Sequence, residues 1–309
     1  MKKERGNYVF GHKLFVIIMI FALALISHAT AQPEVSDSVT TMGLSGATSI
    51  YGLPTARVSW PGQNFGFNVG YHFTAADPDW DNDDDVKMAH NIGANFGFLK
   101  WVEASVVFDF QPEYWTAGGG DNNDLLIGAK VQLPFKNASY PAVAVGGNIQ
   151  FLNMGGDNGG ANKQNEYAGT TQFYAAITYA ASFFGAPLET TAVLGKTFVI
   201  DSNDRQADRD KIGKTNIDFG MGLDMTIFPN TFQHFVHWLA EYSNFSYSND
   251  SLGADYSVRG VMNTGVRVDL SRIPALDKFN AAIDVMGTDL LDHKQRGFSL
   301  GFVFGMPVL

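Results

Sequence analysis

Charged residues recur at every second position of several segments that are otherwise apolar. Asp218 and Asp224 fall in one phase, and bulky apolar residues occupy positions between them. Because strand side chains point alternately to two faces, such charges would gather on one face. In a water-filled pore, a set in which acids outnumber bases favours cations. A structural ion-pair network that fills a narrow interior is the equal alternative. The candidate residues are Glu103, Asp109, Lys130, Asp218, Asp224, Glu241, Arg267, Asp269 and Asp284, joined by His237 if its segment is a strand.

The most acidic stretch, residues 77–86, reads DPDWDNDDDV. Carboxylates at alternating positions suit hard cations, so Ca²⁺ is a weak hypothesis for this stretch. The glycine and glutamate of an EF-hand loop are absent from the required positions. A solvated acidic loop, bridged to lipopolysaccharide through divalent ions, is the favoured interpretation. The candidate ligands are Asp77, Asp79, Asp81, Asp83 and Asp85. We expect no other metal and no cofactor.

The elements that must position these residues show a period of two. In the segment 65–73, for instance, Phe65, Phe67 and Val69 alternate with small or polar residues. On a helix such residues would scatter over all faces, whereas on a strand they form one apolar and one polar face. The pattern predicts about twelve strands, between ten and fourteen. Two segments are less clear: residues 188–200 are apolar on both faces, and residues 236–248 also fit a short helix.

The polar face separates two all-β architectures. A soluble β-sandwich or solenoid would expose this face to water and usually carry Lys, Glu and Thr there. Here the face is rich in Gly, Asn, Ser and Ala, as expected for a confined lumen. Connections alternate between short turns and long polar loops, and aromatic residues gather near strand ends. The sequence therefore predicts a transmembrane, antiparallel, up-and-down β-barrel.

The N-terminus has the three regions of an export signal. Basic residues precede an apolar run of 13 residues, Leu14–Ile26, and the segment ends in Ala29-Thr30-Ala31. This order is typical of a cleavable signal peptide. Its removal takes away four basic residues and one acid and changes the formal net charge from −10 to −13. We expect residues 1–31 to be the signal, 32–60 a lead-in or plug, and 61–309 the barrel.

Composition excludes several other classes of protein. The 309 residues include no cysteine, so neither disulfides nor Cys-ligated metals are expected. The acidic balance argues against nucleic-acid binding, which needs Lys and Arg. A mean hydropathy of −0.05 argues against a polytopic helical membrane protein.

The signal, the hairpin pattern and the final segment GFSLGFVFGMPVL (residues 297–309) together resemble bacterial outer-membrane β-barrel proteins. Residues 42–58, MGLSGATSIYGLPTARV, are similar to the start of YjbH-type barrels linked to exopolysaccharide secretion. The resemblance implies an outer-membrane location, with lipid, lipopolysaccharide and the barrel-assembly machinery as partners. The family's usual terminal Phe is replaced by Leu309, which departs from the assembly signal.

Some barrels of this strand number are phospholipases with His and Ser side by side on the lipid face. His90 falls on an apolar strand face, but no Ser lies within two residues on that face, and no Gly-x-Ser-x-Gly occurs. We therefore expect no enzyme. The predicted function is a narrow porin-like channel for small or cationic solutes, with residues 42–58 as a plug whose Arg57 meets a luminal acid. The alternative is a closed structural, surface or polysaccharide-export-associated barrel without pore activity.

Overall fold

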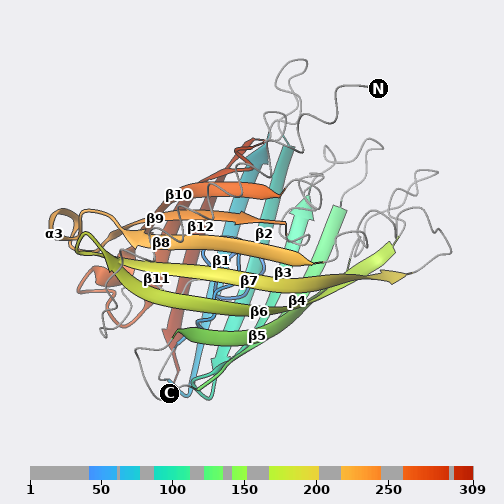
Figure 1. Cartoon of the computed structure of the whole chain (residues 1–309), viewed down its shortest axis with the longest axis horizontal. Coiled ribbons are helices and arrows are strands. Elements are labelled where there is room, and N and C mark those ends of the chain that lie inside the picture. The colour runs from blue at the N-terminus through green and yellow to red at the C-terminus, as the bar shows by residue number, and fades with distance from the viewer. Residues whose placement is uncertain are drawn as a thin grey trace.

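Twelve strands in the described part of the chain close into one antiparallel barrel, in which each strand pairs with its sequence neighbours and β1 pairs with β12 (Figure 1). The computed structural model describes residues 42–60, 63–76, 87–111, 122–134, 141–151, 167–201, 217–244, 260–291 and 296–308. The strands are β1 (Phe65–Ala76), β2 (Lys87–Phe98), β3 (Val102–Gln111), β4 (Asn122–Gln132), β5 (Ala142–Phe151), β6 (Tyr167–Phe183), β7 (Ala186–Asp201), β8 (Asp218–Thr226), β9 (Val236–Ser243), β10 (Val261–Asp269), β11 (Asn280–Thr288) and β12 (Gly297–Pro307). The prediction of a closed barrel of about twelve antiparallel strands is confirmed.

The barrel is apolar outside and polar inside, the reverse of a water-soluble protein. Large apolar side chains such as Ile92, Phe173 and Leu194 are more than half exposed on the outer face. The alternating residues are buried and mostly polar or small, for example Asn95 and Gln172. An apolar outer band around a polar interior is the pattern of barrels that sit in lipid. Among the described residues, no helix is long and apolar enough to cross a membrane.

Short connections gather at one end of the barrel, which we call the turn end. Two of them contain successive residues with positive φ: Leu99 (53°) and Lys100 (72°) in the three-residue loop between Phe98 and Val102, and Phe184 (49°) and Gly185 (81°) in the two-residue loop between Phe183 and Ala186. Positive φ at both central residues matches the right-handed twist of the flanking strands. The helix α3 (Pro229–Phe232) and the 3-10 helix η3 (Leu270–Arg272) lie in two longer connections at the same end.

Both of the less clear segments form strands where the structure describes them. Residues 188–200 belong to β7, with Glu189, Thr191 and Thr197 buried on its inner face. The strand β9 covers Val236–Ser243, and the helical turn α3 lies before it. His237 therefore faces inward and is 1% exposed.

Candidate functional site

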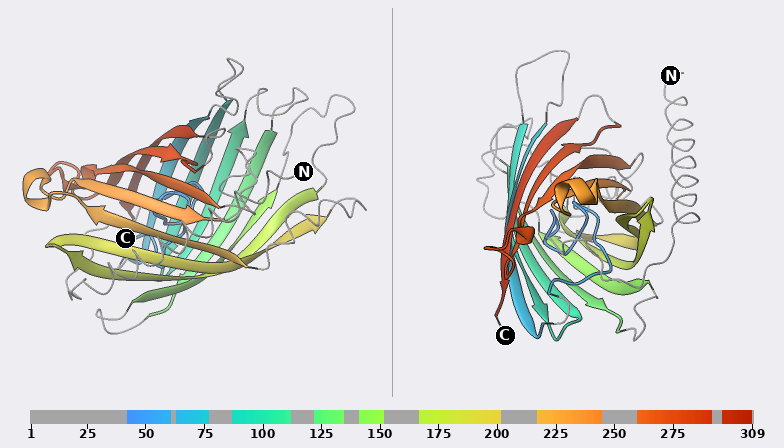
Figure 2. Two further views of the ribbon diagram at one scale, coloured as in Figure 1. Left: turned by 45° about the horizontal axis from the view of Figure 1, so that its top comes forward. Right: turned by 90° about the vertical axis from the view of Figure 1, so that its left-hand side faces the viewer.

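Residues 42–60, which we call the inner segment, lie inside the ring of strands (Figure 2, right). Leu53, Ala56 and Val58 are completely buried. The segment folds on itself: Leu44 N donates to the Tyr51 carbonyl oxygen at 3.0 Å, and Thr55 N donates to that of Thr48 at 3.0 Å. Its two β-bridges are internal and separate from the barrel's ladder. Residues 42–60 are thus a compact loop enclosed by the wall.

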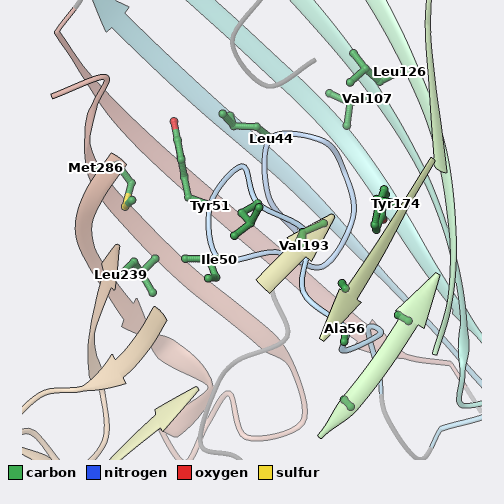
Figure 3. Close-up of a cluster of buried hydrophobic side chains, with 14 residues drawn as sticks. Leu44, Ile50, Tyr51, Ala56, Val107, Leu126, Tyr174, Val193, Leu239 and Met286 are labelled. Carbon is green, nitrogen blue, oxygen red and sulfur yellow. The ribbon is translucent and has the colours of Figure 1, made fainter. Parts of the chain in front are cut away.

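The inner segment packs against most sides of the wall through apolar contacts (Figure 3). It contributes Leu44, Ile50, Tyr51, Leu53 and Ala56 to a buried apolar cluster. The wall contributes Val107 of β3, Leu126 of β4, Tyr174 of β6, Val193 of β7, Leu239 of β9 and Met286 of β11, among others. Burial also raises the pKa of the Tyr51 hydroxyl above its ordinary value, so this group stays neutral. The segment therefore crosses the lumen rather than lining one side of it.

Glycines on the inner wall make room for the segment. A Cβ atom at Gly70 would lie 2.3 Å from Met42 Cε, and one at Gly220 would lie 2.2 Å from Leu53 Cδ1. A Cβ atom at Gly97 would lie 2.5 Å from the carbonyl oxygen of Ser59. Several glycines of the inner face therefore have a packing reason that the period of two alone does not reveal.

We call the inner-wall surface that contacts the inner segment, including Gly70, Gly97 and Gly220, its seat. Gly97→Ala tests this seat, because the added carbon meets the backbone of Ser59 rather than the end of a flexible side chain. We expect the barrel to form and the segment to shift at Ser59, with more frequent channel openings in planar bilayers. Ala175→Val is the matched control, since Ala175 faces outward and is exposed. Equal opening frequencies in Gly97→Ala and the control would contradict the seat.

The first charged contact with the segment comes from β3 and β4. Glu103 and Lys130 face each other across the strand pair and lie 3.3 Å apart (Oε1 to Nζ). The Glu103 carboxylate accepts hydrogen bonds from Thr48 N and Ser59 N, both at 2.7 Å, and from the Thr48 hydroxyl at 2.5 Å. Lys130 Nζ donates to the carbonyl oxygens of Thr48 at 3.0 Å and Thr55 at 3.1 Å. This pair, the first clamp, binds donors and acceptors of the segment's backbone.

The second clamp comes from β9, β10 and β11. The Glu241 carboxylate accepts from three consecutive backbone N–H groups, those of Tyr51 (3.1 Å), Gly52 (3.0 Å) and Leu53 (3.0 Å). Asn263 Nδ2 also donates to Glu241, at 2.9 Å. Successive N–H groups that converge on one anion form a strong binding geometry.

Arg267 completes the second clamp. It donates to the Ile50 carbonyl oxygen at 2.6 Å and makes a bidentate pair with Asp284 at 2.7 and 2.8 Å. Arg267 and Asp284 are directly opposite each other across β10 and β11. Together the two clamps bind residues between Thr48 and Ser59 from two separate groups of strands.

Three further contacts hold the later part of the segment. Thr178 Oγ1 accepts from Ala56 N at 2.8 Å, and Gln132 Oε1 accepts from Val58 N at 3.2 Å. Arg57 Nη2 pairs with Glu189 Oε1 at 2.9 Å. Arg57 therefore meets a luminal acid, but Glu189 was absent from the candidates because β7 is apolar on both faces.

Replacing Arg57 by Gln should have a small effect, because the Arg57 side chain is 28% exposed and water screens the pair. We expect the closed form to lose about 1 kcal/mol or less relative to the open form, which raises the open fraction by roughly fivefold at most. Single-channel recording would measure this fraction. An increase as large as that from a substitution in either clamp would show that Arg57 matters more than its exposure implies.

The structure places all nine candidate residues on inward positions with 5% exposure or less. Four of them, Asp109, Asp218, Asp224 and Asp269, contact or face other residues of the wall. Asp224 Oδ1 contacts His237 Nδ1 at 2.8 Å, and Asp218 Oδ2 accepts from Gln172 at 3.0 Å. Asp269 accepts from Ser271 N at 2.9 Å, which caps η3, and Asp109 lies opposite Asp124 across β3 and β4.

Sequence reasoning missed Asp124, Glu189 and His72, all buried on the inner face. Asp124 shares the phase of Lys130, so the alternation on β4 already carried that signal. The acidic residues Asp77–Asp85 lie outside the described residues, so the Ca²⁺ hypothesis is untouched. His90 lies on the outer face, where Nδ1 is 2.8 Å from the Tyr71 hydroxyl.

A closed antiparallel barrel with an apolar exterior and a polar, charged interior defines a transmembrane β-barrel of the outer-membrane class. No family model and no curated protein matches the chain, so the similarity to YjbH-type barrels stays a prediction.

Solved structures with this general architecture include the KdgM porin, with 8% identity, coverage of 77% of this chain and 98% of that chain, and a TM-score of 0.44. A TodX mutant, a monoaromatic hydrocarbon channel, has 7% sequence identity and a TM-score of 0.43, and the match covers 92% of this chain and 98% of that chain. The outer membrane phospholipase A from Escherichia coli has 9% sequence identity and a TM-score of 0.36, and the match covers 88% of this chain and 98% of that chain. These weak likenesses add nothing to what the strand pairing itself establishes.

Proposed function

We propose that the protein is a gated outer-membrane channel that the inner segment closes and that passes small cationic solutes when the segment withdraws. One observation carries the proposal: residues 42–60 are bound by side chains of the wall and stand apart from the barrel's hydrogen-bonded ladder. A loop held in this way can leave without breaking any strand pair. Withdrawal would open the lumen while the barrel stays intact.

The preference for cations follows from the charges of the wall. Among the described strand residues, nine buried acids face two buried Lys or Arg residues, Lys130 and Arg267. Low-dielectric walls focus such a field, which raises the local concentration of cations and lowers that of anions. The acids are Glu103, Asp109, Asp124, Glu189, Asp218, Asp224, Glu241, Asp269 and Asp284.

Reversal potentials in a potassium chloride gradient test this function. We expect brief openings of the full-length protein in planar bilayers, with a reversal potential on the cation-selective side. Anion selectivity of these openings would contradict the charge argument. Silence of both the full-length chain and a chain without the inner segment would exclude channel function altogether.

The competing proposal is a permanently closed structural or surface barrel, including an assembly or polysaccharide-export role. The apolar cluster favours it, because withdrawal would expose Ile50, Leu53 and their wall partners to water. Both proposals include a cleaved signal peptide, contacts with lipid and lipopolysaccharide, and insertion by the barrel-assembly machinery. Neither includes an enzyme activity.

A further inference from the structure

Three carboxylates on different strands of the barrel receive hydrogen bonds from the inner segment. Glu103 of β3 receives two N–H groups and one hydroxyl, and Glu241 of β9 receives three N–H groups. Glu189 of β7 receives the guanidinium of Arg57 through two nitrogen atoms, at 2.9 and 3.1 Å. All three are nearly fully buried. Glu103 and Glu241, whose bonds to the segment are themselves buried, need such partners most, because an unpaired buried charge is strongly unfavourable.

Withdrawal of the segment removes these donors and carries the positive charge of Arg57 away. Glu103 keeps Lys130 and Glu241 keeps Asn263. Charge-assisted N–H contacts to carboxylates are stronger than neutral hydrogen bonds, so a ligand with several ammonium groups could replace the lost donors. From this geometry we infer that the seat of the inner segment is a binding site for a linear polyamine, which occupies the seat when the segment leaves. The inference rests on the proposed gated channel.

The distribution of the acids favours an extended organic cation over a metal ion. Glu103, Glu189 and Glu241 come from three separate strands and bind different parts of the segment. Among the described residues, no three His, Asp or Glu side chains gather closely enough to hold a metal ion. A flexible chain with amines along its length can reach acceptors that a single ion cannot bridge.

Binding in the seat is linked to opening. A polyamine that binds the open form but not the closed form shifts the equilibrium towards the open form by its difference in affinity. The same ligand would therefore be both an opener and a transported solute.

The absence of cysteine from the chain allows a direct test. Ala47→Cys places one thiol in the segment at a position that is 3% exposed. The rate of labelling by a hydrophilic maleimide then reports segment withdrawal in the full-length protein, reconstituted in lipid nanodiscs. The probes are spermidine and, at equal ionic strength, magnesium chloride. Glu241→Gln and Asp218→Asn are introduced separately into the Ala47→Cys chain.

We expect spermidine to accelerate labelling several-fold, with saturation, and magnesium to have little effect. Glu241→Gln should raise the basal rate and weaken the response to spermidine. Asp218→Asn removes a luminal charge that binds Gln172 and Thr197 rather than the segment, so the response to spermidine should fall far less than in Glu241→Gln.

Equal acceleration by magnesium, or an undiminished spermidine response in Glu241→Gln, would overturn the inference. If the chain without the segment conducts but spermidine does not accelerate labelling, the polyamine site is wrong and the gated channel stands. If that shortened chain is silent, the gated channel itself is wrong.

Discussion

A chain that lacks residues 33–58 is expected to conduct ions continuously, whereas the full-length chain is closed most of the time. The segment lies inside the barrel and packs against strands on several sides, and packed protein leaves almost no continuous water path. Its removal should therefore raise the mean conductance per barrel by roughly tenfold or more. Single-channel recording in planar bilayers measures the change.

The control for this deletion replaces residues 33–58 by a Gly/Ser linker of the same length. Both shortened chains should still form the barrel, which circular dichroism and resistance to unfolding in detergent would check. Because the linker lacks the apolar side chains and Arg57, it should leave the lumen open as the deletion does. A folded, shortened barrel with the conductance of the full-length chain would favour the permanently closed barrel.

Glu241→Gln is the single substitution with the largest expected effect. The carboxylate accepts three backbone N–H groups of the segment, and an amide in its place turns one acceptor into a donor that opposes them. Hydrogen bonds to a charged group contribute about 1.5–3 kcal/mol each, so we expect the closed form to lose about 3 kcal/mol. That loss corresponds to a roughly hundredfold shift towards the open form.

The open fraction in bilayers, compared with that of Asp218→Asn, measures this shift. Asp218 is another buried luminal acid, but its contacts are to Gln172 and Thr197 of the wall. Both substitutions remove one negative charge, so a shared effect would be electrostatic. A selective effect of Glu241→Gln would be due to the clamp, and similar open fractions in the two variants would count against it.

Much of the barrel was predictable because its signal is local. Alternation such as Asp218, Gly220 and Gly222 against Phe219 and Met221 reports which side chains face lipid. The same alternation indicated that Glu103, Glu241 and Arg267 would share the inner face. Where both faces are apolar, as on β7, the phase is ambiguous, and Glu189 was missed for that reason.

The contacts of the inner segment could not be predicted from the local alternation of residues in the sequence. Glu241 and Gly52 are 189 residues apart in the chain, and their contact depends on the closure of the barrel and the path of the segment. The small, nearly uncharged composition of residues 42–58 suggested a plug. Its backbone N–H groups as partners for carboxylates, and glycines such as Gly70 and Gly97 as its seat, follow only from the packing.

Adding the inner segment back as a separate molecule tests most directly whether it closes the lumen. A synthetic peptide of residues 42–60 is added to open channels formed by the chain without residues 33–58, and the current is recorded. We expect saturable closure by the peptide, weaker closure in barrels that carry Glu241→Gln, and no closure by a peptide of scrambled sequence. Currents that are unaffected by the native peptide, or blocked equally by the scrambled one, would contradict the claim that this segment closes the lumen.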